Sequence, residues 1–213
     1  MAREHYLKAR NAVAVVAFIA WAIAVYVGFL SYPGEFWEKV RVTFMECRAK
    51  DGIFIALSPV VVLVLTGLIS SENKARLVFW RIHDVLPGHR AFSEWARKDP
   101  RIDIQALRDK LGEFPAKPKD QNAVWYSVYR KHATALRVQK PHQRFLLARD
   151  LCVISFLFAV TGPWSLLLFG HEGLWVLAYF SLMLAHYVAL SVVARNHGNR
   201  MVCNVLAEQS LVE

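Results

Sequence analysis

The chain has 213 residues, of which 55% are hydrophobic, and its 26 Lys and Arg residues against 17 Asp and Glu give a formal net charge of +9. This composition excludes an intrinsically disordered chain, and three cysteines are too few to frame a disulfide-rich fold of this length. A chain that is both apolar and strongly basic indicates that apolar and charged residues lie in separate segments.

Four stretches of 19 to 21 residues carry no charged side chain, namely residues 12–31, 52–70, 151–169 and 174–194. A helix of this length is about 30 Å long, which matches the hydrocarbon core of a bilayer. The first stretch follows a basic tail but lacks a small-residue cleavage site, which favours a retained anchor over a signal peptide. The sequence therefore predicts an all-α membrane protein with four transmembrane helices.

The connecting segments divide the chain into regions and set its orientation. Residues 1–70 comprise the N-terminal tail, spans one and two, and a loop whose residues around Phe36 and Trp37 indicate a short interfacial helix. Residues 71–150 form a module that holds 17 of the 26 Lys and Arg residues, 151–194 form a transmembrane hairpin, and 195–213 form an amphipathic tail. Because basic segments stay in the cytoplasm, we expect both termini and the module on that side.

Small residues at four-residue spacing form stripes on two spans: Ala20, Ala24 and Gly28 on span one, and Ser181, Ala185 and Ala189 on span four. Such stripes let helices approach closely, within one chain or between copies in a homo-oligomer. Pro59 and Pro163 predict kinks in spans two and three, which allow a gate or a cavity. His186 lies inside span four, either as a functional group or as a neutral ring bonded to a neighbouring hydroxyl or carbonyl. No Asp, Glu, Lys or Arg lies in any span, which argues against an ion-coupled transporter.

The module between spans two and three is predicted to be helical, because no strand pattern occurs in it. A continuation of span two keeps a helical period that includes Ile82, up to the break at Pro87. A short helix follows over 91–98, and Pro100 ends it. Asp103 then caps a helix that Gly112 stops.

An amphipathic helix is predicted over 121–136, with one face formed by Trp125, Val128, Tyr129, His132 and Leu136. Pro141 predicts a break before span three. Gly198 lies near two Asn residues, which predicts a turn between span four and the C-terminal tail. The apolar face of that tail packs either on the membrane or on the module.

Aromatic residues stand beside basic ones throughout the module, a combination that suits a ligand with a phosphate and a stacking base. The same aromatic residues can instead form the core of the module. The candidate residues for a cytoplasmic ligand or partner are Arg81, His83, Arg90, Arg97, Lys98, Arg101, Trp125, Tyr129, Arg130, Lys131 and His132. Lipid headgroups, a nucleotide signal, a nucleic acid and a partner protein all remain open as the occupant.

Catalytic motifs are absent from the sequence. It has no P-loop, no G-x-S-x-G and no dinucleotide fingerprint, and its His and Cys residues lack metal-ligand spacing. We therefore expect no enzymatic activity, no cofactor and no metal site. An enzyme with an unfamiliar site, for example a nuclease that uses His142, is kept as an alternative.

Several phrases carry a resemblance to known proteins: LPGHRAFS at 86–93, KDPRID at 98–103, QNAVWY at 121–126, HQRFLLARD at 142–150 and NHGNRMVCNVLA at 196–207. They resemble small bacterial four-span membrane proteins that are similar to effectors of anti-phage defence systems. The resemblance covers about half of the chain. It implies a membrane-perturbing effector in the bacterial inner membrane, held silent until a cytoplasmic signal or a defence-system partner arrives.

Two functions are therefore expected from the sequence. The first is a non-enzymatic effector that assembles in the bilayer as a homo-oligomer and perturbs or permeabilises it when the module receives a signal or partner. The second is a membrane-anchored adaptor, whose spans only tether a module that docks a soluble partner or a nucleic acid. Loss of membrane integrity distinguishes the two, because an adaptor permeabilises nothing.

Overall fold

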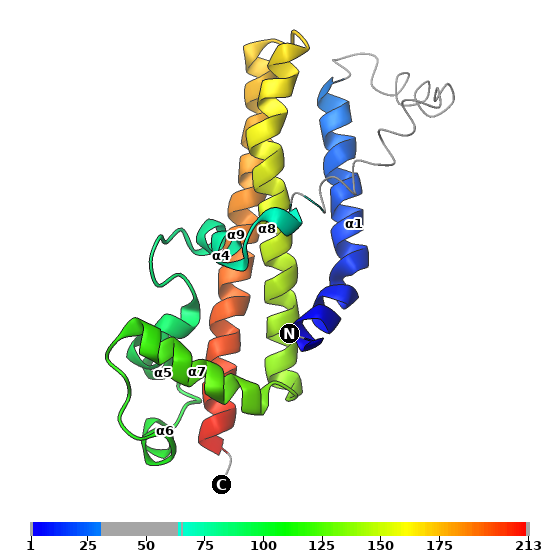
Figure 1. The fold of residues 1–213 in the computed structure, drawn as a ribbon. Helices are drawn as coiled ribbons and strands as arrows, with labels where there is room; N and C mark the ends of the chain where they lie inside the picture. Colours follow the sequence, from blue (N-terminus) through cyan, green and yellow to red (C-terminus); the bar gives the residue numbers. More distant parts are fainter. Residues whose placement is uncertain (1, 31–63, 65, 212–213) are drawn as a thin grey trace. The chain divides into compact units, whose positions relative to one another are not determined.

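The computed structural model describes residues 2–30, 64 and 66–211, and these residues are helical with connecting turns (Figure 1). The elements are α1 (Ala2–Leu30), α4 (Ser71–Phe79), the short 3₁₀ turn η1 (Pro87–Arg90), the π turn η2 (Ala91–Trp95), α5 (Ala96–Lys98), α6 (Ile104–Leu111), α7 (Pro118–His132), α8 (Leu136–Leu168) and α9 (Gly173–Leu211). The predicted all-α fold is confirmed for this part of the chain.

Among the described residues, three helices are long and apolar enough to cross a membrane: the Ala9–Leu30 part of α1, Leu136–Leu168 and Gly173–Leu211. They cover the first, third and fourth predicted spans, except for the last residue of the first and of the third. Most of the second predicted span, with Pro59, and the predicted interfacial helix lie outside the described residues. The number of four spans and the orientation remain predictions.

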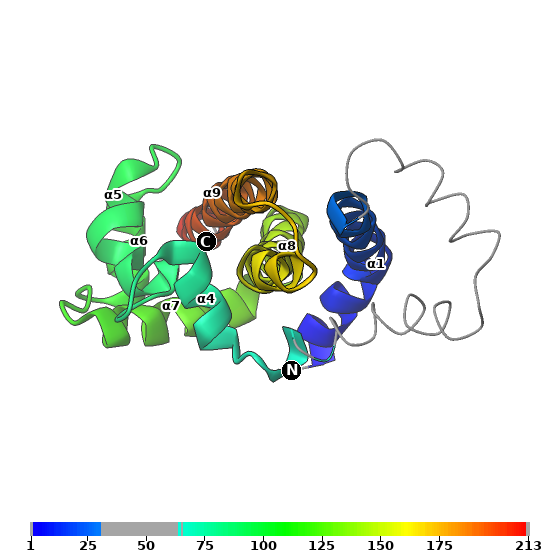
Figure 2. The same ribbon diagram turned by 90° about the horizontal axis from the view of Figure 1, so that it is seen from above.

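The chain divides into two compact units. Unit 1 comprises Met1–Ser70 and Asp150–Leu190, and unit 2 comprises Ser71–Arg149 and Ser191–Glu213. Helices α8 and α9 lie side by side (Figures 1 and 2), and each contains residues of both units.

Unit 1 is built around Tyr179 of α9, which is fully buried. Its ring packs on Gly162 of α8, where an added Cβ would lie 2.6 Å from the Tyr179 hydroxyl. Tyr26 and Phe29 of α1 meet the same ring edge-on, at centroid distances of 5.9 and 5.2 Å. The Tyr26 hydroxyl also hydrogen-bonds Ser165 Oγ at 2.8 Å. Aromatic packing and a glycine contact therefore hold α1, α8 and α9 together in this unit.

The small-residue stripes do not make these contacts. Ala20 and Ala24 are exposed and Gly28 is half-buried, while the buried residues of α1 include Ile19 and Ala22. On α9 the stripe of Ser181, Ala185 and Ala189 is exposed along its length. Both stripes are thus left on the outside of unit 1.

Two local predictions in unit 2 are confirmed. The Asp103 carboxylate accepts a hydrogen bond from the Ala106 backbone N at 3.0 Å and caps α6. Gly112 ends the same helix with φ +76°, a conformation that glycine adopts without strain. The short helical segment over 91–98 is also present, as η2 followed by α5.

The predicted continuation of α4 to Pro87 is wrong. The helix ends at Phe79, and Trp80 takes φ +53°. Ile82, which the helical period placed on a buried face, is 72% exposed. Leu136 is likewise exposed, since α7 ends at His132 and Leu136 is the first residue of α8.

The predicted break at Pro141 is wrong, because α8 continues through this residue. Proline has no N–H to donate to the carbonyl four residues earlier, which belongs to Arg137. Asn204 Nδ2 donates to that carbonyl oxygen instead, at 2.6 Å. A side chain from α9 thus compensates for the hydrogen bond that the proline removes.

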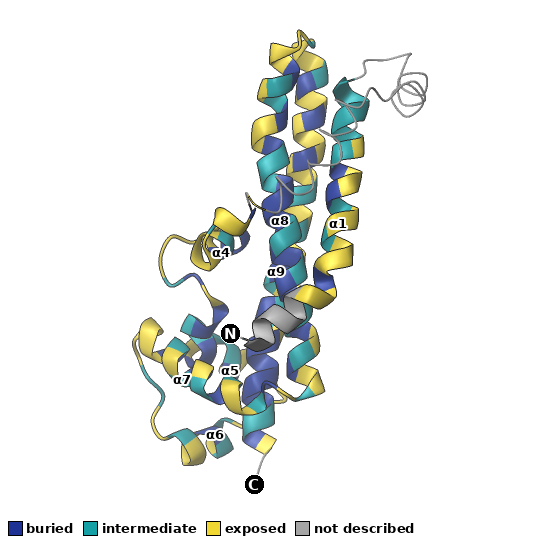
Figure 3. Cartoon of the chain, turned by 45° about the vertical axis from the view of Figure 1, so that its right-hand side comes forward, coloured by how far each residue is buried: buried dark blue, intermediate teal, exposed yellow. Residues whose placement is uncertain are grey.

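The predicted turn at Gly198 is also wrong, because α9 runs unbroken from Gly173 to Leu211. A Cβ at Gly198 would lie 3.2 Å from both Phe145 and Phe79. The glycine therefore serves close packing of three elements of unit 2 rather than a turn. Beyond it, the helix carries an almost continuous buried band over 201–207 (Figure 3).

Candidate functional site

The core of unit 2 joins the module to the C-terminal part of α9. Phe92, Leu107, Trp125 and Val128 from the module form one buried cluster with α9 residues Met201, Val202, Cys203, Val205, Leu206 and Ala207. Of the two surfaces proposed for the C-terminal apolar face, the structure places it on the module. The last part of α9 is therefore a structural element of the module.

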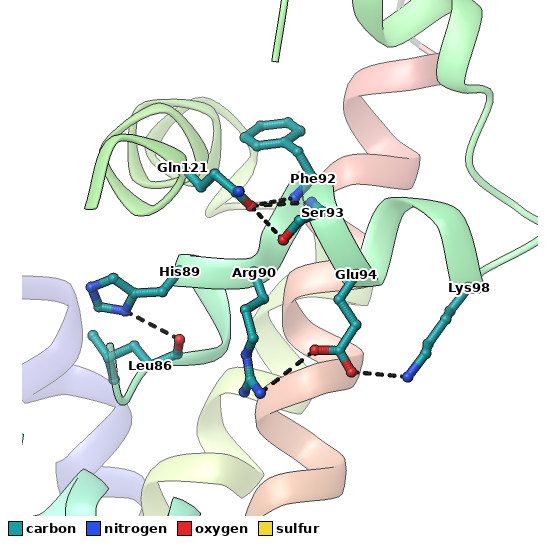
Figure 4. A network of polar contacts seen from close by, with 8 residues as sticks. All are labelled: Leu86, His89, Arg90, Phe92, Ser93, Glu94, Lys98 and Gln121. Carbon is teal, nitrogen blue, oxygen red and sulfur yellow. Dashed lines mark hydrogen bonds and ion pairs between the residues drawn. The ribbon is translucent and has the colours of Figure 1, made fainter. Parts of the chain in front are cut away.

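Gln121 holds the first residues of η2 in place. It is buried, and its Oε1 accepts hydrogen bonds from the backbone N of Phe92 at 3.2 Å and from the backbone N and the hydroxyl of Ser93 at 3.1 Å each (Figure 4). Nearby, Gly88 lets Trp125 approach, since an added Cβ would lie 2.8 Å from Trp125 Cε3. The phrases at 86–93 and 121–126 are thus brought into contact.

Two of the candidate cations share one carboxylate. Glu94 lies 3.5 Å from Arg90 Nη1 and 2.9 Å from Lys98 Nζ (Figure 4). Both cations also lie near the Trp95 ring, at 6.0 and 5.3 Å from its centroid. Burial, and secondly the charge of Arg81, lower the pKa of Arg90. Positive charge is therefore concentrated around Arg81 and Arg90.

Arg101 is occupied by an internal network. It hydrogen-bonds the Asp99 carboxylate through Nε at 2.9 Å and Nη2 at 2.6 Å, and Nη2 also reaches Asn204 Oδ1 at 3.0 Å. The Arg101 hydrogen bond lowers the pKa of Asp99 to about 2. The phrases at 98–103 and 196–207 meet here, and Arg101 joins them through this network.

The aromatic candidates divide between the core and its edge. Trp125 is 6% exposed, so it offers no face to a stacking ligand in this conformation. The half-buried Tyr129 hydroxyl hydrogen-bonds His142 Nδ1 at 2.8 Å, and His132 Nε2 hydrogen-bonds Gln209 Oε1 at 2.8 Å. These three candidates therefore stabilise the module.

The remaining candidates in unit 2 lie on its surface and are not brought together as one site. Those that are exposed are Arg81, His83, Arg97, Arg130 and Lys131. Arg81 and His83 belong to the segment after α4, Arg97 belongs to α5, and Arg130 and Lys131 end α7. Arg130 stacks near the exposed Tyr126 ring, with a distance of 5.7 Å to its centroid.

In unit 1, His186 Nδ1 donates a hydrogen bond to the Leu182 carbonyl oxygen at 2.8 Å, and its ring lies 4.7 Å from that of Trp21. This is the bonded arrangement that the sequence left open for this residue. Pro163 lies inside α8, which continues to Leu168.

Three functional candidates escaped the sequence prediction: Trp80, Arg195 and Asn204. The Arg195 guanidinium lies 3.7 Å from the Trp80 ring centroid, and its Nε donates to the Val78 carbonyl oxygen. One signal was available for Arg195, because it is the first charged residue after the uncharged stretch 174–194. Trp80 stands next to Arg81, an aromatic–basic pairing that the module repeats elsewhere, and nothing local marks Asn204.

Among the described residues, no group of three or more His, Cys, Asp or Glu side chains is placed to hold a metal ion. No protein-family model, no curated protein and no solved structure matches the chain.

Proposed function

We propose that this chain is a non-enzymatic, multi-pass effector of the bacterial inner membrane that perturbs or permeabilises the bilayer when its basic module receives a signal or partner. Both termini and the module are cytoplasmic, and the working form is a homo-oligomer. The resemblance to defence effectors makes anti-phage defence the biological context.

The proposal depends mainly on one observation. The unbroken helix α9 contains both an apolar part of membrane length and residues of the module core. The uncharged stretch 174–194 is followed, without a turn, by the buried residues Met201 to Ala207. Helix α8 has the same property in reverse, since Val138 lies in the module core and the uncharged stretch 151–169 follows. We expect a repacking of the module core to displace the ends of two candidate spans.

This continuity favours an effector over the alternative, a membrane-anchored adaptor. A tether needs only a flexible connection between its anchor and its docking module. In this chain α8 and α9 form the connection, and each helix includes both a candidate span and residues of the module. The exposed stripes of small residues on α1 and α9 further favour close packing between copies in the bilayer.

The test uses regulated expression in a bacterium that carries a membrane-potential dye. Val193 of α9 is 44% exposed and adjoins the boundary between the units. Val193→Pro removes a backbone N–H and costs the helix about 3 kcal/mol, without removing a core side chain. Val193→Ala is the matched control, since it keeps the helix intact.

We expect the wild type and Val193→Ala to depolarise the cell at high expression, because assembly depends on concentration and populates the active state by mass action. Val193→Pro should insert normally and leave the potential intact. Depolarisation by the proline variant would refute coupling through α9. An intact potential in wild-type cells at every expression level would refute the effector and leave the adaptor.

A further inference from the structure

A shallow cavity of about 430 Å³ opens on unit 2 beside the end of α4. It is lined by Asn73, Arg76, Leu77, Trp80, Arg81 and Ile82, which together are called the Trp80 surface. The first three belong to α4 and the last three to the segment that follows it.

The aromatic and aliphatic groups of this surface are exposed. Trp80 is 53% exposed and Ile82 is 72% exposed. The Trp80 ring is nevertheless held in place, because the Arg195 guanidinium stacks at 3.7 Å from its centroid and the Trp80 backbone N donates to the Arg76 carbonyl oxygen at 2.9 Å. A fixed indole beside an exposed isoleucine is an apolar contact surface that needs no rearrangement to bind.

Positive charge surrounds this apolar contact. Arg76 and Arg81 line the cavity, and Arg195 packs on the Trp80 ring. Glu72 forms an ion pair with Arg76 at 2.7 Å. This ion pair is solvent-exposed and contributes little stability, so Arg76 can exchange Glu72 for an anionic group of a partner. The charge of Arg81 also extends towards Arg90, whose pKa it helps to lower.

The position of the surface in the chain indicates its partner. Helix α4 begins at Ser71, directly after the predicted second span, and its nine residues are about 13 Å long. Trp80 thus stays within reach of the bilayer surface. Trp and Arg are the side chains that favour the headgroup layer, where an apolar body meets a polar and negatively charged boundary. An exposed isoleucine at the same place fits an acyl boundary better than the polar surface of a nucleic acid.

We propose that the Trp80 surface docks on anionic lipid headgroups, with Trp80 and Ile82 at the acyl boundary and Arg76 and Arg81 on the phosphates. The docking depends on the chain being embedded in a membrane, which the three candidate helices indicate, and it does not depend on the effector activity. It would hold the start of the module against the bilayer, on the side where the module leaves the second predicted span.

The experiment measures backbone amide hydrogen exchange in the full-length protein, reconstituted in nanodiscs of phosphatidylglycerol or of phosphatidylcholine. Residues 81–86 are compared with residues 112–117, a second exposed connection of unit 2 that carries no such surface. Arg81→Gln removes one cation from the surface. Arg130→Gln is the matched control, because Arg130 also lies beside an exposed aromatic residue, Tyr126.

We expect residues 81–86 to exchange more slowly in phosphatidylglycerol than in phosphatidylcholine, while residues 112–117 exchange equally in both. Arg81→Gln should reduce that protection on the order of fivefold, since one basic residue near an anionic surface contributes about that factor. Arg130→Gln should leave it unchanged. Protection of the buried Cys203 thiol from labelling reports that each variant is folded.

Equal exchange of residues 81–86 in the two lipids would overturn the proposal, whether both are fast or both are slow. Protection produced in phosphatidylcholine by added polynucleotide, and absent with phosphatidylglycerol alone, would also overturn it and assign the surface to nucleic acid. Neither result bears on permeabilisation, which the depolarisation assay measures separately.

Discussion

Asn204 is predicted to be the residue that lets α8 continue through a proline. Its Nδ2 donates to the Arg137 carbonyl oxygen at 2.6 Å, which Pro141 leaves without a backbone donor, and its Oδ1 accepts from Arg101 Nη2 at 3.0 Å. Asn204 is itself buried. Replacing it with alanine therefore removes two hydrogen bonds and leaves one carbonyl unsatisfied.

The expected cost of Asn204→Ala is about 2–3 kcal/mol in the stability of the module, from the two lost hydrogen bonds and the unsatisfied carbonyl. In a Pro141→Ala background the cost should be smaller by about 1 kcal/mol, because the substituted residue would supply a backbone N–H to the Arg137 carbonyl. The two substitutions are thus coupled, although they are on different helices.

Thiol labelling of Cys203 provides the assay. This residue is buried and next to Asn204, so its labelling rate in the full-length protein reports opening of the module core, and peptide mass spectrometry separates it from the other cysteines. Asn204→Ala should accelerate labelling by one to two orders of magnitude, which is the free-energy cost expressed as a rate ratio. Equal acceleration in the proline and alanine backgrounds would refute the compensation.

Two further predictions concern the ion pair of Asp99 with Arg101 and the contact of Gly162 with Tyr179. Asp99 has its pKa lowered from 3.8 to about 2 by Arg101, so the stability it gives the module is complete above pH 4 and is lost as the pH falls towards 2. Acidification over that window should cost the wild type about 1–2 kcal/mol, allowing for the exposed arginine, and Asp99→Asn should be insensitive to it; a parallel loss in both proteins, followed by denaturant unfolding in detergent at each pH, would contradict this. Gly162→Ala should destabilise unit 1 by about 1–3 kcal/mol, because the added methyl meets the fully buried Tyr179 ring. Thermal unfolding in detergent checks it, with Gly173→Ala as the control, since nothing lies within 4 Å of a Cβ there; equal melting of the two variants would contradict the packing argument.

The parts of the fold that could be predicted from the sequence are those that depend on local chemistry. Asp103 and Gly112 bound a helix through a side-chain cap and a left-handed conformation, and both signals lie within a few residues of their effect. The uncharged stretches are similarly local, because their length alone matches a bilayer.

The wrong predictions concern residues whose conformation is decided by distant partners. A proline inside a helix usually breaks it, as expected for Pro141. Here Asn204, which is 67 residues from Arg137 in the sequence, donates to the Arg137 carbonyl oxygen in place of the missing backbone N–H. Gly198 between polar residues favours a turn, but the two phenylalanine rings packed against it favour a continuous helix. At both positions tertiary packing overrides the local preference for ending the helix.

The binding candidates show the same limit. Trp80 and Trp125 both lie near basic residues in the sequence. Trp125 is buried in the module core, whereas Trp80 is exposed and packs against the Arg195 guanidinium. The pairing of aromatic and basic residues marks both equally. What separates them is burial, which follows from the packing of α9 against the module.

In the proposed effector, the packing state of the module controls the membrane through unbroken helices. The most direct measurement is release of a trapped dye from liposomes that contain purified full-length protein, with Val193→Ala and Val193→Pro compared at equal, increasing density. We predict release that rises steeply with density for Val193→Ala and is absent for Val193→Pro, while Cys203 stays protected in both. Equal release from both variants, or none from either at any density, would contradict the claim.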